Sequence, residues 1–271
     1  MNRRKKTLIL IIGTITLLLT ILLAGLFINE ESLEADFSRK NLPPSSSYIY
    51  GTDWLGRNML LRTIKGLSIS LLVGLSASIV SGGMALIIGS ISGVAPKIID
   101  QVINWFIDLV MGIPHLVLLI MISFALGRGV KGILIGIAIT HWTSLARLIR
   151  GEVLQIRSEH YIKVSQSLGK SRIYIIRKHI LPHILPYILV GTILLFPHAI
   201  LHEAAITFLG FGLSPEQPAV GIILSESMKY LSSGMWWLAV LPGLSLIFIV
   251  ILFEKLGEHF KVLLDPHSSQ E

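Results

Sequence analysis

Residues 159–182 read EHYIKVSQSLGKSRIYIIRKHILP, a polar and basic stretch that lies between two hydrophobic ones. Gly169 divides the stretch where a helical hairpin needs a breaker. Pro182 and Pro186 fall in the first turn of the following apolar run, where proline is tolerated. The stretch predicts a helical hairpin on a membrane surface, and a solvated loop that carries a topology signal is the alternative. Each half repeats apolar residues at helical spacing: Tyr161, Val164 and Leu168, then Ile173, Ile176 and Ile180.

The composition is that of a membrane protein. Of 271 residues, 52% are hydrophobic and 14% are charged, whereas a soluble domain carries roughly a quarter charged residues. The excess of Lys and Arg over acids, 23 against 16, could suggest nucleic acid as a partner. These residues flank the apolar runs, however, which favours a topology signal and no nucleic-acid partner. The absence of cysteine excludes disulfides and thiolate metal sites.

Apolar runs along the chain predict an all-α membrane protein with six transmembrane helices. The first run follows four basic residues and lacks a clear cleavage site, so we expect an uncleaved anchor. Basic residues are more frequent on the predicted inner side, which places both termini inside a multi-pass protein of the cell membrane. The predicted spans are residues 7–28, 67–94, 98–126, 133–145, 184–209 and 238–253.

Features between and within these spans lead to further predictions. Small residues in 67–94 predict close packing against other helices, and Pro114 predicts a kink in the third helix. In the external segment, GTDWLGRN (51–58) predicts a structured turn with an Asp53–Arg57 pair. Asp108 is expected to bond within the helix bundle. We divide the chain into an anchor and external segment, a membrane domain that contains a cytoplasmic loop at 146–183, and a tail: 1–66, 67–257 and 258–271.

Four motifs resemble one protein family. They are GTDWLGRN (51–58), ARLIRGEVLQIRSEHYIKVSQSLGKSRIYIIRKHILPHILP (146–186), EAAITFLGFGL (203–213) and LDP (264–266). Together they resemble, over almost the whole chain, the permease subunits of ATP-binding-cassette (ABC) importers in the dipeptide, oligopeptide and nickel branch. The resemblance implies the type-1, MetI-like permease fold. THWTSLARLIR (140–150) and PHAILHEAAITFLGFGL (197–213) look most like the nickel-transporting members of the second, C-type kind.

The resemblance implies a pore subunit that is not an enzyme and binds no cofactor itself. Its expected partners are a second permease subunit in a heterodimer, two ATP-binding subunits that carry the ATP, an extracytoplasmic substrate-binding protein and membrane lipid. The loop would couple to an ATPase. One departure is that the family's Glu-Ala-Ala start is replaced here by Lys163, Val164 and Ser165, so a glutamate salt bridge from position 163 is not available. The predicted coupling residues are Tyr161, Val164, Gly169, Arg172 and Arg177.

Ionisable residues inside the apolar runs are the candidates for a substrate pathway. His198 and His202 lie at i, i+4 on one helix face in the outer half of the bilayer, with Glu203 beside them. His141 in the fourth span is a further candidate. Imidazole is a good ligand for nickel, copper and zinc, so His198 and His202 are predicted transient metal ligands. The alternative is that each bonds a neighbouring helix.

The resemblance favours nickel, carried as a small chelate, and three other functions compete with it. A dipeptide or oligopeptide permease has the same fold. A stand-alone proton-coupled carrier could use His198, His202, Glu203 and Asp108 as a relay, but it would have no use for a docking hairpin. An intramembrane metalloenzyme finds no support, because His202–Glu203 is not followed by the second histidine of a His-Glu-x-x-His motif.

Overall fold

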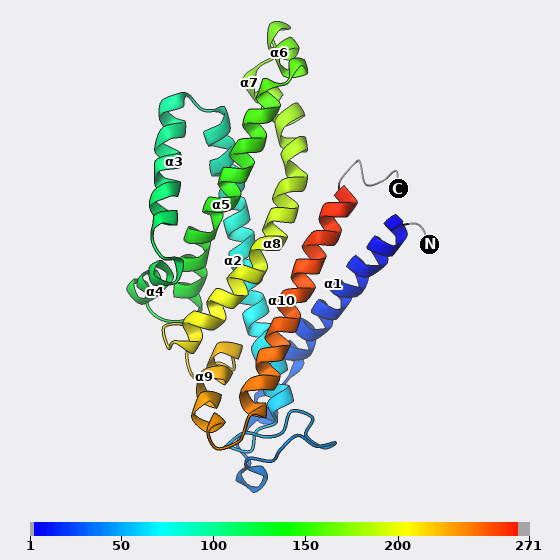
Figure 1. Ribbon diagram of the computed structural model, residues 1–271, viewed down its shortest axis with the longest axis vertical. Helices are drawn as coiled ribbons and strands as arrows, with labels where there is room; N and C mark the ends of the chain where they lie inside the picture. The colour runs from blue at the N-terminus through cyan, green and yellow to red at the C-terminus, as the bar shows by residue number, and fades with distance from the viewer. Residues whose placement is uncertain (1–2, 265–271) are drawn as a thin grey trace.

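The computed structural model describes residues 3–264, and these are almost entirely helical (Figure 1). Five helices are long and apolar enough to cross a membrane, and a bent pair of helices makes a sixth where the pair is counted as one span. The predicted all-α membrane fold is therefore confirmed, with five to six candidate spans. The long helices are α1 (Arg3–Phe27), α2 (Met59–Val94), α5 (Val130–Ser158), α8 (Leu181–Phe208) and α10 (Trp237–Leu264). The shorter elements are η1 (Glu30–Leu33), η2 (Phe37–Arg39), α3 (Lys97–Gly112), α4 (His115–Ala125), α6 (His160–Ser167), α7 (Arg172–Ile175), the π-helical turn η3 (Ile176–Ile180) and α9 (Val220–Leu231).

The bent pair is α3 and α4: the predicted kink at Pro114 is present, but it breaks the segment into two helices rather than bending one. The two helices meet at an angle of 95°. Pro114 has no N–H for a helical hydrogen bond, and it disfavours helical geometry at the residue before it. Ile113 accordingly has extended backbone angles, φ −90° and ψ 134°. The break turns α4 across the bundle beside α5, as Figure 1 shows, and it makes His115 the first residue of a new helix.

Three boundaries also differ from the predicted ones. α2 begins at Met59 rather than at residue 67, because the Asn58 side chain accepts from the backbone N–H groups of Leu60 and Leu61 and so caps the helix. α5 continues to Ser158, so the first third of the predicted loop is helix. α10 runs to Leu264, so residues 258–264 of the predicted tail are also helical. The other tail residues, including Asp265 and Pro266 of the LDP motif, lie outside the described part of the chain.

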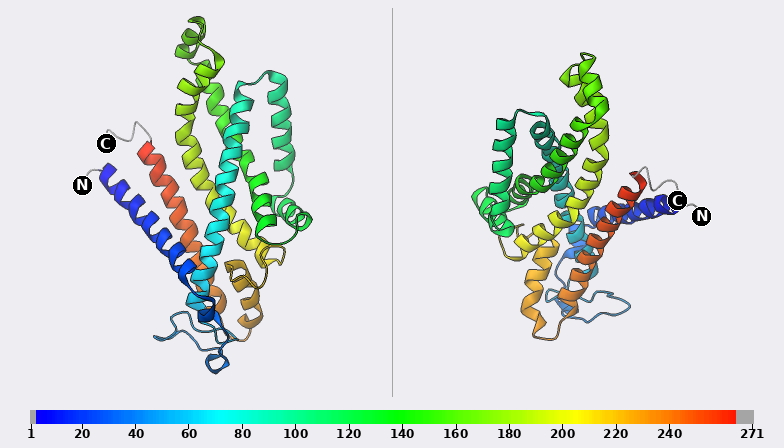
Figure 2. Two further views of the ribbon diagram at one scale, coloured as in Figure 1. Left: turned by 180° about the vertical axis from the view of Figure 1, so that it is seen from behind. Right: turned by 45° about the horizontal axis from the view of Figure 1, so that its top comes forward.

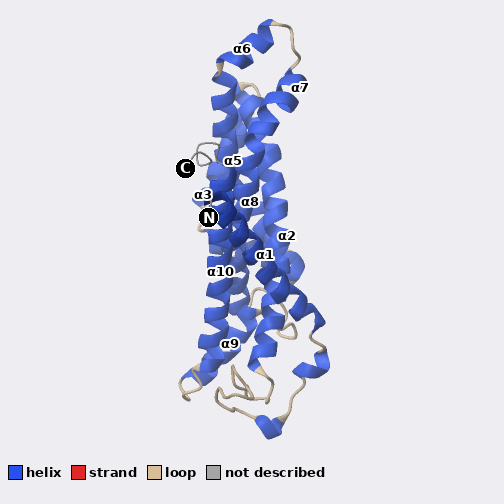
Figure 3. Ribbon diagram, turned by 90° about the vertical axis from the view of Figure 1, so that its right-hand side faces the viewer, coloured by secondary structure: helices blue, strands red, loops and turns tan. Residues whose placement is uncertain are grey.

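The long helices form a bundle with loops at one end and the hairpin at the other (Figure 3). α6 and α7 stand at the tip of a stalk made by α5 and α8, away from the external segment and α9. α1 and α10 pack against each other, and the start of α1 and the end of α10 lie on the same side of the bundle (Figure 2). The core lies where α2 packs along α5 and α8.

Glycines allow α2 to approach its neighbours closely, as the sequence predicted. A Cβ atom built on Gly89 would lie 2.6 Å from the Ala146 carbonyl oxygen of α5. Gly83, on the same helix, has nothing within 4 Å of such an atom. The close approach at Gly89 therefore depends on the missing side chain, as in other membrane helix pairs.

We expect Gly89→Ala to destabilise the protein by about 1–3 kcal/mol, because the α5 backbone must move to admit one methyl group. Gly83→Ala is the matched control and should be neutral or slightly stabilising, since alanine is the better helix former. Thermal unfolding of the two purified variants in detergent measures the difference. Equal unfolding midpoints would show that the α2–α5 contact tolerates a side chain.

Candidate functional site

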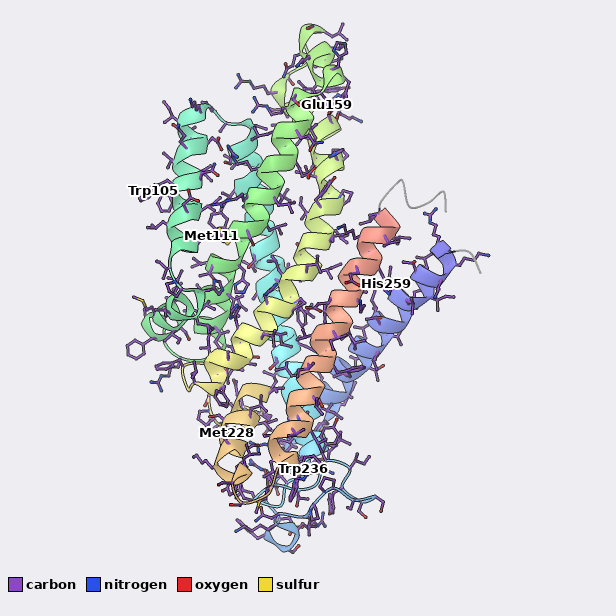
Figure 4. All side chains as sticks on the ribbon, in the orientation of Figure 1. Trp105, Met111, Glu159, Met228, Trp236 and His259 are labelled. Atoms are coloured by element: carbon purple, nitrogen blue, oxygen red, sulfur yellow. The ribbon has the colours of Figure 1, made fainter. Side chains whose placement is uncertain are left out.

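A polar cavity opens where the α3–α4 break meets α5 and α8. Its volume is about 500 Å³. Met111, labelled in Figure 4, belongs to its α3 wall. Hydroxyl and imidazole groups dominate the polar part of its lining, and such groups at membrane depth typically line a pathway. These polar residues are His115, Thr140, His141, Thr143, Ser144, His198 and His202.

Three histidines converge in this cavity from three helices. His115 begins α4, His141 lies in the first half of α5, and His202 lies near the C-terminal end of α8. Their ring centroids are 4.5 Å (115–141), 4.6 Å (115–202) and 5.2 Å (141–202) apart. A ring nitrogen from each lies within 4.8 Å of a ring nitrogen of the other two.

Hydrogen bonds fix the ring of His141. Its Nδ1 lies 3.1 Å from the Ile137 carbonyl oxygen and 3.2 Å from the Thr140 hydroxyl. A carbonyl only accepts, so Nδ1 carries the proton and Nε2 presents a lone pair. His141 is 6% exposed, and its Nε2 has no hydrogen-bond partner within residues 3–264. The Nε2 of His115 is likewise buried without a partner there.

The structure brings together some of the predicted pathway residues and separates others. His141 and His202 belong to the cluster. His198 is exposed and lines the same cavity, but it is not one of the three histidines whose ring nitrogens meet. Glu203 is fully buried, is not part of the lining, and accepts a hydrogen bond from Thr207 at 3.0 Å. Of the four predicted pathway residues, His141, His198 and His202 therefore line the cavity and Glu203 does not, and their roles in transport and metal binding remain predictions.

His115 was missed by sequence reasoning. The sequence shows an isolated histidine in an apolar run, and its relevance depends on the 95° bend that carries it to α5 and α8. The only local signal is Pro114 before it, which predicted a kink without its direction. Asp108 bonds within the bundle as expected, to Arg147 of α5.

The hairpin is the second candidate site. Gly169 has φ +74°, a left-handed conformation that suits glycine, and it ends α6 as predicted. Ile162 and Ile175 turn inward and are buried. Of the residues in the predicted apolar stripes, Tyr161, Val164, Leu168 and Ile173 are exposed, whereas Ile176 is half-buried and Ile180 is buried. Exposed apolar side chains at a protruding tip indicate a contact surface.

The arginines of the 146–183 segment fall into two groups. Arg147, Arg150 and Arg157 tie α5 to the bundle: Arg150 binds Asp100 of α3 at 2.5 and 2.6 Å, and Arg157 donates to the Gly93 carbonyl. They are structural ties rather than part of a free basic surface. Within the described residues, Arg172 and Arg177 are exposed and form no ion pair.

A buried ionic network organises the end of the bundle opposite the hairpin. Asp53 is fully buried and binds Arg57 at 2.7 Å, which confirms the predicted pair. Arg62, at the start of α2, binds both Asp53 and Glu226 of α9. The Trp54 ring stacks on Tyr230 at 4.6 Å. The GTDWLGRN turn therefore fastens the external segment to α2 and α9, a partnership with Glu226 that the sequence did not reveal.

Comparisons with known proteins agree with this architecture. The inward-facing MetNI methionine ABC transporter has a similar fold, with a TM-score of 0.62 over 76% of this chain and 98% of that one, at 17% identity. An amino acid ABC transporter crystallised with histidines gives a TM-score of 0.58 over 74% and 92% of the two chains, at 20% identity. The fold is that of a MetI-like ABC importer permease.

Sequence similarity identifies the family. Residues 85–266 match the family described as the binding-protein-dependent transport system inner membrane component. The dipeptide transport system permease protein DppC of Bacillus subtilis is 32% identical over 98% of this chain and 84% of its own. The oligopeptide permease protein OppC of the same organism is 32% identical over 98% and 88%. The chain belongs to this family of multi-pass importer permeases, which work with separate ATP-binding and substrate-binding subunits and are not themselves enzymes.

Proposed function

We propose that this chain forms half of the pore of an ATP-driven importer of short peptides. The observation that carries the proposal is the 32% identity to dipeptide and oligopeptide permeases over 98% of the chain. The polar cavity beside α3, α4, α5 and α8 supports it, because a peptide backbone needs donors and acceptors where it crosses the membrane. Peptide takes the place of the nickel cargo expected from the sequence, since these named relatives are peptide permeases.

The hairpin would deliver the driving force. We infer that α6 and α7 dock on an ATP-binding subunit through their exposed apolar residues together with Arg172 and Arg177. ATP binding and hydrolysis change the shape of that subunit, and only contacts that differ between its two states can move the permease. The stalk formed by α5 and α8 leads from this tip to the cavity, so a rotation of the stalk would reach two of the four helices that line the cavity.

The same docking defines the orientation in the cell membrane. With the hairpin in the cytoplasm, both termini are also inside, and the Asp53 network faces out, where a substrate-binding protein arrives. A second, different permease subunit completes the pore. In this arrangement residues 1–66 anchor and brace the outer side, 67–257 form the transport unit, and the segment from 258 onward reaches the cytoplasm.

Uptake by cells tests the peptide cargo directly. A strain that lacks this gene should take up labelled dipeptides and tetrapeptides at a small fraction of the wild-type rate, because half of the pore is missing. The intact gene should restore uptake. Unchanged uptake of all the peptides, accompanied by loss of labelled nickel uptake, would instead support the nickel permease.

A further inference from the structure

The cluster of His115, His141 and His202 is the feature that a peptide pore alone does not require. A histidine with a purely structural role satisfies its ring nitrogens within the fold. Here two buried ring nitrogens, on His115 and His141, have no partner among residues 3–264. Both belong to residues that line the same cavity.

We propose that these three histidines form a binding site for a divalent transition metal ion within the translocation cavity. The proposal rests on the proposed import function and deepens it: the cargo would be a metal ion held by a short peptide or a similar amino-acid chelator. One substrate, a metal ion held by a peptide-like chelator, then accounts both for the similarity to peptide permeases and for the imidazole groups that line the cavity.

The geometry supports coordination. Three ligands come from three helices, and their ring nitrogens already lie within 4.8 Å of one another. A tetrahedral metal with bonds of about 2.0–2.1 Å needs its nitrogens roughly 3.3 Å apart. Side-chain rotations that bring the nitrogens together by about 1.5 Å would close the site, and the neighbouring cavity of about 500 Å³ leaves room for such rotations.

The hydrogen bonds of His141 are those of a metal ligand. Donation from Nδ1 to a backbone carbonyl sets the tautomer, orients the ring and leaves Nε2 free to coordinate. The Ile137 carbonyl that accepts this bond lies one turn earlier on α5, so the ring is held by its own helix. The ring of His141 is therefore oriented before any metal arrives.

The donor set indicates the kind of metal. Imidazole suits zinc, nickel, copper and cobalt, whereas magnesium and calcium need oxygen ligands. No carboxylate among the described residues lines the cavity: Glu203 is turned toward Thr207, and Asp108 is paired with Arg147. Three neutral ligands leave the ion its charge and leave a fourth position open, which a carboxylate or amine of the chelator can fill.

The position of the site suits passage rather than storage. His202 lies six residues from the outer end of α8, about 9 Å along the helix. His198, one turn closer to the cytoplasmic end, lines the same cavity. A metal that enters from outside would meet the three-histidine site first and His198 next.

Metal binding by the purified protein tests the proposal without transport. The full-length protein in lipid nanodiscs is dialysed against nickel chloride or zinc chloride, and bound metal is measured by mass spectrometry. We expect about one ion per chain, and His115→Gln, His141→Gln and His202→Gln should each weaken binding at least tenfold, since changes to the partners of metal ligands alone cost 10–100-fold. With cobalt, the intense visible absorption of a tetrahedral site should appear in the wild type and vanish in these variants.

A control at a histidine outside the cavity makes the test specific. His183→Gln, on the exposed part of α8, reports adventitious surface binding. Since His115 is only partly buried, its variant should keep the wild-type unfolding midpoint even if the His141 variant does not. Wild-type affinity in the His115 and His202 variants would overturn the site.

The outcomes separate this site from the proposed function. If the three-histidine variants bind metal like the wild type while cells import peptides through the permease, the site is wrong and the peptide function stands. If the variants lose metal but the intact permease imports neither metal-free nor metal-loaded peptide, the site stands and the peptide function is wrong.

Discussion

Reversal of the charges at Arg172 and Arg177 together, to glutamate, is expected to abolish uptake while the protein remains in the membrane at its normal level. Both side chains are exposed and neither forms an ion pair within the described residues, so folding loses little, about 0.5 kcal/mol or less for each change. At an interface with an ATP-binding subunit, like charges brought together cost several kcal/mol. Labelled peptide uptake and co-purification of the ATP-binding subunits measure the two effects.

The matched control reverses two lysines at the opposite end of the molecule. Lys131, at the start of α5, and Lys229, on α9, are also exposed, so Lys131→Glu with Lys229→Glu changes the net charge by the same amount. This variant should still bind the ATP-binding subunits and retain most of its uptake. Normal uptake in the Arg172 and Arg177 variant would show that the hairpin charges do not contribute to coupling.

Most of the hairpin could be predicted from the sequence, because the residues that form its turn and helices are close together in the chain. Gly169 marked the turn, and apolar spacing marked both helices. The direction of the apolar stripe was a separate question. Tyr161 and Val164 face outward, while Ile162 packs against the bundle, since that choice depends on where α5 and α8 hold the hairpin. Periodicity gives a stripe but does not say which surface it meets.

The cavity could be predicted only in part, because its parts come from distant segments. His141 and His202 were identified as polar residues in apolar spans, but their meeting depends on how α5 and α8 pack. His115 depends in addition on the direction of the break at Pro114. Glu203 follows His202 directly, and one residue along a helix turns a side chain by about 100°, which is enough to move it from the cavity to the core. Composition cannot resolve such a difference.

The network around Asp53 shows the same limit of sequence-based prediction. Asp53 and Arg57 are four residues apart and could be paired from the sequence. Arg62 and Glu226 are 164 residues apart, and only the fold brings them together. Asp53 accepts the backbone N–H groups of Leu55 and Arg57 at 2.9 and 3.0 Å through one oxygen, and it binds both arginines through the other. One buried carboxylate therefore holds the turn and both cations.

Asp53→Ala is expected to destabilise the protein by about 3–5 kcal/mol, because it leaves Arg62, which is only 3% exposed, without one of its two counter-charges. Asp53→Asn should cost less, since the amide oxygen can still accept the two backbone N–H groups. Thermal unfolding in detergent and the amount of protein in the membrane measure both variants. Unfolding of Asp53→Ala at the wild-type midpoint would contradict the importance of the network.

Asp36→Ala is the matched control for this measurement. Asp36 lies in the same segment and binds Arg39 at 2.9 Å, but the two side chains are 41% and 56% exposed. The hydroxyl and backbone N–H of Ser38 hold the pKa of Asp36 below its usual value, yet solvent screens the ion pair, so exposed pairs of this kind contribute little. The Asp36 variant should stay close to wild type. The contrast would show that burial, rather than the number of ion pairs, makes the Asp53 network important.

A double variant shows why Asp53→Ala destabilises the protein. It distinguishes an unpaired buried cation from the loss of the hydrogen bonds that hold the turn. If an unpaired buried cation causes the loss, then Arg62→Met combined with Asp53→Ala should be more stable than Asp53→Ala alone, because no buried charge remains on α2. If instead the loss comes from the turn that Asp53 holds through backbone N–H groups, the second change should give no recovery. The network joins the external segment to α2 and α9, so its failure would release the outer end of the helix that packs along both α5 and α8.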